Sequence, residues 1–128
     1  MRLLIDTHIL LWWMTNDPAL PAIAKATLQD RRSQIFVSAA SIWEISIKQA
    51  LGRLKFPLDG IEEQLAKAGF TPLGINVAHA ARAGTLPPHH QDPFDRMLVA
   101  QAQLEGLTLV SVDAIMRRYA VAILGHDG

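Results

Sequence analysis

Short apolar runs recur along the chain and are separated by longer segments with helical signals. The apolar runs predict strands at residues 3–5, 35–37, 107–110 and 121–124, and a short edge strand at 70–73. Continuous apolar runs are typical of strands buried on both faces of a parallel sheet. The intervening segments predict helices at residues 9–14, 19–31, 42–51, 61–68, 78–83 and 93–105.

Glycine and proline mark several boundaries of these helices. Gly52, Gly69 and Gly106 each follow a predicted helix, where a glycine commonly ends the last turn. Asp92 and Pro93 match an N-cap followed by proline at the first helical position. The alternation of strands and helices predicts an α/β fold, a three-layer sandwich with a central parallel sheet of about five strands and helices on both faces. One domain, residues 1–128, is expected from the length.

Composition excludes some kinds of site and changes what is expected of others. The chain has no cysteine, which excludes disulfides and thiolate zinc sites and fits a reducing cytoplasm. No apolar run reaches the ~18 residues that a membrane span needs, so we expect a cytoplasmic protein. Twelve basic and twelve acidic residues balance, so the excess of positive charge usual among nucleic-acid binders is missing. Bound divalent cations could supply the positive charge that faces phosphate.

Four acidic residues are predicted to converge at the carboxyl edge of the sheet, where open α/β folds bind their ligands. Asp6 follows the first strand, and Asp113 follows the strand at 107–110. Glu44 lies in the first turns of the helix that leaves the second strand. Asp95 lies in the first turn of a helix that must run back to the amino edge. Four separate segments therefore deliver carboxylates to one place.

Carboxylates gathered in this way indicate a metal site. They repel one another, and burial would raise some of their pKa values unless cations neutralise them. Oxygen ligands favour Mg²⁺, with Mn²⁺ as a substitute, and phosphate oxygens can complete the coordination shell. A pair of such ions would activate water and stabilise the leaving oxygen, so the substrate is expected to be a phosphodiester or a nucleotide.

Each acid also has a purely structural explanation. Ser41 and Glu44 match a capping box, in which the glutamate only reaches back to a backbone amide. Lys48, one turn after Glu44, has the spacing of an ordinary helical ion pair. Asp95 could simply favour the helix dipole in the first turn. The two strand-end aspartates could be turn residues. The coincidence of all four favours the metal site.

Histidines and scattered basic residues give weaker signals. His89 and His90 lie in a loop after two prolines and are expected to be loop and surface residues, with a substrate contact as the alternative. His8 could approach the site or be structural. Phosphate contacts are possible, but not individually indicated, for six basic residues: Arg53, Lys55, Arg82, Arg96, Arg117 and Arg118.

Three stretches make the chain resemble the PIN-domain ribonuclease toxins of bacterial type II toxin-antitoxin systems, the VapC group. They are LIDTH at residues 4–8, SAASIWEI at 38–45 and DPFDRMLVAQA at 92–102. The resemblance runs nearly end to end, and the last two stretches are the most distinctive. It implies a PIN-like sandwich and a metal-dependent endoribonuclease that cuts RNA as the toxin of such a system.

The same resemblance implies roles for particular residues. The matching acids of such proteins coordinate metal, and here they are Asp6, Glu44, Asp95 and Asp113. Many relatives carry threonine near the fourth acid, and Ser111 keeps a hydroxyl in that place. Ser111 and Thr7, the latter in the first motif, are expected to support the site. A homodimer and a cognate VapB-like antitoxin that holds the toxin inactive are implied as well.

Two other functions stay open at this point. One is a phosphohydrolase that uses Asp6 as a strand-end nucleophile, although the second aspartate two residues later, typical of haloacid-dehalogenase-type phosphatases, is replaced by His8. The other is a catalytically silent module that binds metal and acts through its partner. A trapped phosphoaspartate would favour the first, and RNA that stays intact in the presence of metal would favour the second.

Overall fold

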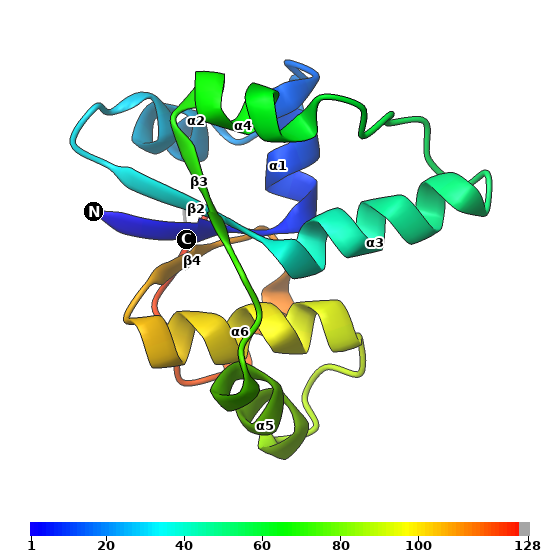
Figure 1. Cartoon of the computed structure of the whole chain (residues 1–128). Helices are drawn as coiled ribbons and strands as arrows, with labels where there is room; N and C mark the ends of the chain where they lie inside the picture. The colour runs from blue at the N-terminus through cyan, green and yellow to red at the C-terminus, as the bar shows by residue number, and fades with distance from the viewer. Residues whose placement is uncertain (126–128) are drawn as a thin grey trace.

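A five-stranded parallel sheet forms the centre of the computed structural model, which describes residues 1–125 (Figure 1). Neighbouring strands pair in the order β3-β2-β1-β4-β5, and every pairing is parallel. The strands are β1 (Arg2–Ile5), β2 (Gln34–Ser38), β3 (Phe70–Leu73), β4 (Thr108–Val110) and β5 (Ile123–Leu124). The predicted sheet, with 70–73 at its edge, is confirmed. Residues 126–128 of the predicted domain lie outside the described residues.

Helices cover both faces of this sheet, as predicted. Figure 1 shows α1, α2 and α4 on one side of the sheet and α5 and α6 on the other. The helices are α1 (Thr7–Met14), α2 (Ala22–Gln29), α3 (Ala39–Ala50), α4 (Ile61–Ala68), α5 (Val77–Thr85) and α6 (Pro93–Glu105), with a 3₁₀ turn, η1 (Ala114–Arg118). Among these described residues no helix has the length and apolar character needed to cross a membrane.

The alternation of side chains along β1 explains why the sheet needs cover on both faces. Leu3 and Ile5 belong to one buried cluster, together with residues of α1, α2 and α4. Leu4 belongs to a second cluster, which includes Leu98 and Val99 of α6. Successive residues of a strand point to opposite faces, so a run of three apolar residues places hydrophobic groups in both layers. The side chains of Leu3, Leu4 and Ile5 are all fully buried.

Several element boundaries differ from the predictions by one to three residues, among them the start of α2 at Ala22, and two of the differences have a clear physical reason. Helix α3 begins at Ala39, earlier than predicted, because the Ser38 hydroxyl accepts a 3.0 Å hydrogen bond from the Ala40 amide and caps the helix there. Strand β5 is shorter than predicted because residues before Ile123 leave η1 in irregular backbone, although the Leu109 amide still donates to the Ala122 carbonyl. Neither change alters the sheet edge at which the acids were expected.

Candidate metal centre

Two of the predicted acids lie at the ends of neighbouring central strands. Strands β1 and β4 pair with Ile5 opposite Val110, and the Asp6 amide donates to the Val110 carbonyl at 3.0 Å. The Asp6 carboxylate is 4% exposed and caps α1 by accepting from the Ile9 amide at 2.9 Å. Asp113 caps η1 by accepting from the Ile115 amide at 2.9 Å. Both aspartates therefore serve as local caps and also face one edge of the sheet.

Ser111 links these two acids. Its side chain forms a hydrogen bond with the Asp6 carboxylate. Its hydroxyl oxygen also accepts from the Asp113 amide at 3.1 Å. Because Ser111 is fully buried, this hydroxyl is held in place by its surroundings and fixes the relative position of the two aspartates.

Glu44 is held by a hydrogen bond and an ion pair, and its side chain is buried. Thr7 Oγ1 donates to Glu44 Oε1 at 2.7 Å, and Lys48 Nζ lies 2.6 Å from Oε2. The capping-box explanation for Glu44 is wrong, because Ser38 caps α3 and Ser41 lies inside the helix. The Ser41 hydroxyl instead lies 3.0 Å from the Thr7 hydroxyl. The predicted ion pair with Lys48 is confirmed, and it shields one side of a carboxylate that is only 4% exposed.

Asp92 and Asp95 have different roles at the start of α6. Asp92 accepts from the amides of Phe94 at 2.8 Å and of Asp95 at 3.2 Å, which confirms it as the N-cap. Pro93 takes the first helical position, as predicted. The side chain of Asp95 remains free of the cap, and it points instead toward the loop that precedes the helix.

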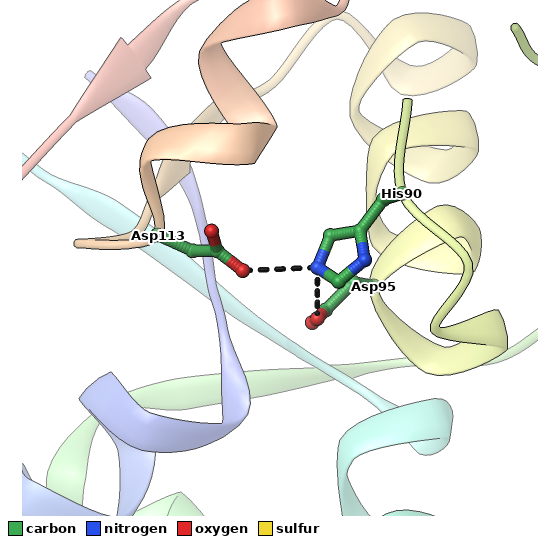
Figure 2. Close-up of side chains that lie close together, drawn as sticks. All are labelled: His90, Asp95 and Asp113. Carbon is green, nitrogen blue, oxygen red and sulfur yellow. Dashed lines mark hydrogen bonds and ion pairs between the residues drawn. The ribbon is translucent and has the colours of Figure 1, made fainter. Parts of the chain in front are cut away.

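His90 joins the acids, which the sequence did not predict. Its Nε2 lies 3.0 Å from Asp95 Oδ2 and 2.9 Å from Asp113 Oδ2, so the ring stands between the two carboxylates (Figure 2). The His90 side chain is only 15% exposed, so the expectation of a surface residue is wrong. No motif spacing could reveal this contact, because it depends on how a loop folds back over the sheet edge.

Two side chains hold this loop in place. The Arg96 guanidinium donates to four backbone carbonyls, those of Ala83, Leu86, Pro87 and His90, at 2.8–3.3 Å. The Tyr119 hydroxyl accepts from the His90 amide at 2.8 Å and donates to the Pro87 carbonyl at 3.0 Å. Arg96 was one of the candidates for a phosphate contact. Its donors face backbone oxygens, and its role in the structure is to shape the loop.

Burial and neighbouring negative charges raise the pKa of two of these carboxylates. Burial raises the pKa of Asp6, and the charge of Asp113 adds to this, against the opposing hydrogen bonds and the nearby His8. Burial also raises the pKa of Asp95 to about 7, helped by repulsion from Asp92, Asp6 and Glu44, while His90 opposes the shift. The predicted rise of carboxylate pKa values in this cluster is thus confirmed for Asp6 and Asp95.

This arrangement suits a divalent cation. The charges of Asp6 and Glu44 contribute to the raised pKa of Asp95, and His90 Nε2 lies within 3.0 Å of both Asp95 and Asp113. Among the described residues Asp95 and Asp113 therefore meet at His90, while Asp6 and Glu44 lie outside this group of possible ligand atoms; carboxylate oxygens are the donors that Mg²⁺ and Mn²⁺ prefer. His90, Asp95 and Asp113 each offer one ligand atom, and these atoms lie within 4.8 Å of one another.

Comparisons with known proteins agree on one family and one fold. The model of the PIN domain matches residues 3–122. Ribonuclease VapC22 of Mycobacterium tuberculosis (strain ATCC 25618 / H37Rv) is 30% identical over 119 residues, which cover 91% of this chain and 90% of the relative. Ribonuclease VapC16 of the same organism is 38% identical over 60 residues, 44% of this chain and 43% of that protein. VapBC2 from Rickettsia felis, solved bound to a DNA fragment from their promoter, has the same fold, with a TM-score of 0.73 and 14% identity over 99% of this chain and 100% of that one.

Proposed function

This chain belongs to the PIN-domain family and, within it, to the VapC group of toxin ribonucleases, and on that premise we propose that it is a metal-dependent endoribonuclease of a type II toxin-antitoxin system. Residues 1–128 would form one PIN domain. The proposal concerns the reaction, the metal and the residues that carry them.

The observation that supports the proposal is the contact of Asp95 and Asp113 with one ring nitrogen of His90, at the carboxyl edge of the sheet where β1 also delivers Asp6. Burial and repulsion from neighbouring acids raise the pKa of Asp95 to about 7. Ionisation of this carboxyl group therefore costs free energy unless a cation is bound beside it. Local capping accounts for part of the role of Asp6 and Asp113, but it does not explain why Asp95 and Asp113 approach the same ring nitrogen of His90. A phosphodiester is the substrate class that such a site accommodates, because its oxygens can share the cation.

We assign the cation to Asp6, Asp95 and Asp113, with Glu44 coordinating directly or through water. Mg²⁺, or Mn²⁺ in its place, would lower the pKa of an attacking water and offset the charge that develops on the phosphate. Thr7 and Lys48 orient the Glu44 carboxylate, and Ser111 sets Asp6 against Asp113. Hydrolysis adds the water oxygen to phosphorus and releases one bridging oxygen as an alcohol.

The proposed partners follow from the family. A VapC toxin is paired with a VapB-like antitoxin, and we propose such a partner here, together with a homodimer and single-stranded RNA as substrate. Because the net charge of the chain is zero, the bound cation and local basic groups would have to attract the RNA. The identity of the RNA does not follow from scattered side chains, so the test below starts from a mixed pool.

The test is cleavage of a mixed RNA pool by purified protein free of antitoxin, with Mg²⁺, with Mn²⁺ and with EDTA. We expect cutting that requires metal and is lost in Asp6→Asn and Asp95→Asn. Asp17→Asn is the matched control, because Asp17 is an exposed aspartate that accepts from the Ala19 amide at 2.9 Å, away from the cluster. Full activity in Asp6→Asn would contradict the assignment. A folded protein that binds metal and leaves RNA intact would favour the silent module, and a trapped phosphoaspartate would favour the phosphohydrolase.

A further inference from the structure

His90 places one ring nitrogen between two carboxylates. Its Nδ1 accepts from the Asp92 amide at 3.3 Å, so in the neutral ring the proton is on Nε2. Nε2 is the atom that lies 3.0 Å from Asp95 Oδ2 and 2.9 Å from Asp113 Oδ2. Nε2 is therefore hydrogen-bonded to Asp113, the N-cap of η1, and lies within ion-pair distance of Asp95 in α6 (Figure 2).

This orientation is the reverse of the one expected for a metal ligand. A histidine that binds metal through one nitrogen usually donates its other N–H to a carboxylate or a carbonyl, which leaves the ligating nitrogen free of hydrogen. The second nitrogen of His90 instead faces a backbone donor, the Asp92 amide. A neutral His90 with a bare Nε2 would bring two N–H groups together at Nδ1. The ring is thus arranged to donate a hydrogen bond to the acids.

The position of the ring is built into the loop. Tyr119 and Arg96 bind the amide and the carbonyl of His90, at 2.8 Å and 3.3 Å, so its backbone is fixed on both sides. The neighbouring His89 follows a different course, since its ring packs edge-on against Tyr119 with centroids 5.1 Å apart. Only one of the two adjacent histidines is directed at the acids.

We propose that His90 is a positioning residue of the metal centre: in the metal-free protein its Nε2 group, hydrogen-bonded to Asp113 and 3.0 Å from Asp95, stands between the two carboxylates in the place of a cation, and it gives way when a divalent cation binds. The inference rests on the proposed metal site. A bridging donor offsets the repulsion between the two carboxylates and keeps the site assembled before metal arrives. The same contact competes with the cation, so the site binds metal more weakly than its acids alone would.

The test is titration of the purified full chain with Mn²⁺, followed by electron paramagnetic resonance of the free ion. His90→Ala and His90→Asn both remove the Nε2 donor, and the Asn side chain still offers an acceptor near the position of Nδ1. We expect both to bind Mn²⁺ roughly threefold to tenfold more tightly than the wild type, the range that the net value of one hydrogen bond predicts. His90→Gln, whose amide can reach the position of Nε2, should restore wild-type affinity, and His89→Ala should match the wild type.

A second readout uses the thermal midpoint of unfolding with EDTA and with saturating Mn²⁺. The increase in the midpoint on adding Mn²⁺ should be larger in His90→Asn than in the wild type, because only the metal-free form has lost its bridge. Weaker Mn²⁺ binding in both donor-free variants would make His90 a ligand and overturn the inference, while the metal site itself would stand. Unchanged affinity would overturn it too. If neither the wild type nor these variants bind Mn²⁺ at a site that Asp95→Asn removes, the proposed metal centre and the inference fail together.

Discussion

The Thr7 hydroxyl donates a 2.7 Å hydrogen bond to Glu44 Oε1, and this bond joins the residue after Asp6 to helix α3. Both residues are 4% exposed, so the contact is shielded from water. Lys48 holds the other oxygen of the same carboxylate. The Thr7 hydroxyl thus fixes the position of Glu44 relative to Asp6, although the two acids are far apart in the sequence.

Replacement of this hydroxyl tests the coupling. Thr7→Val keeps the shape of the side chain but leaves Glu44 Oε1 without its donor, so we expect a loss of about 1–2 kcal/mol in the free energy of unfolding. Cleavage should fall about 10- to 100-fold, as for other residues that orient metal ligands. Thr15→Val is the control, since Thr15 donates to the Leu11 carbonyl at the exposed opposite end of α1. Equal effects of the two substitutions on cleavage would contradict the coupling.

The raised pKa of Asp95 predicts how the stability of the metal-free protein depends on pH. The folded-state pKa of about 7 exceeds the unfolded value near 4, so the folded state binds more protons between these limits. Stability should therefore fall as the pH rises from about 4 to 7 and then level off. Asp95→Asn should reduce this fall and stabilise the protein at pH 8 by about 2 kcal/mol, less than the full shift implies because the side chain is 21% exposed.

Urea unfolding in EDTA at several pH values measures this effect. The pKa of Asp6 is also raised, so Asp95→Asn should flatten the profile without making it level. The same variant should lose RNA cleavage, and stability and activity would then change in opposite directions. If the pH profile of Asp95→Asn were as steep as that of the wild type, ionisation of Asp95 would not be the cause of the pH dependence.

Asp92 acts on Asp95 in two separable ways. It caps α6, so Asp92→Ala should cost about 1 kcal/mol, whereas Asp92→Asn should cost little because asparagine caps equally well. After burial, the charge of Asp92 is the largest contributor to the raised pKa of Asp95. Asp92→Asn should therefore lower the pH at which stability levels off. An unchanged pH profile in a fully stable Asp92→Asn protein would contradict this electrostatic role.

Three of the four acids, Asp6, Asp95 and Asp113, lie where the chain enters or leaves a regular element, whereas Glu44 is the sixth residue of α3. Strand ends and helix starts are marked locally by apolar runs, proline and capping residues, and parallel pairing then brings them to one edge. The boundary at Ser38 could not be predicted as easily, because two serines compete to cap α3 and Ser38 forms the cap. The predicted capping box at Ser41 and Glu44 was wrong for this reason.

His90 could not be predicted because its place depends on contacts distant in the sequence. The loop before α6 has no periodicity, and its course is set by Tyr119 and by the carbonyls that Arg96 binds. Arg96 itself had no signal to distinguish it from an exposed basic residue. Loop geometry of this kind arises from tertiary packing, which a pattern of apolar and polar positions does not encode.

Arg96 should be intolerant even of lysine. Its planar group serves four carbonyls at once, which the single ammonium of Arg96→Lys cannot reproduce. We expect a loss of about 1–3 kcal/mol in unfolding free energy and faster amide hydrogen exchange in residues 86–91. Arg82→Lys is the control, because Arg82 makes one exposed contact, with Gln103 at 3.0 Å. Protection of residues 86–91 that is unchanged in Arg96→Lys would show that the loop does not depend on the guanidinium.

Gly125 lies against the backbone that carries Ser111, and this close approach leaves no room for a side chain. A Cβ there would lie 2.9 Å from the Ser111 carbonyl carbon and closer to its oxygen, at a φ of +149° that favours glycine. Gly125→Ala should push β5 away from Ser111, cost about 1–3 kcal/mol and weaken Mn²⁺ binding, because Ser111 sets Asp6 against Asp113. Gly84→Ala, at a helical position with nothing near its Cβ, should be neutral or stabilising by up to about 1 kcal/mol. Normal Mn²⁺ affinity in a destabilised Gly125→Ala protein would separate the packing of β5 from the geometry of the acids.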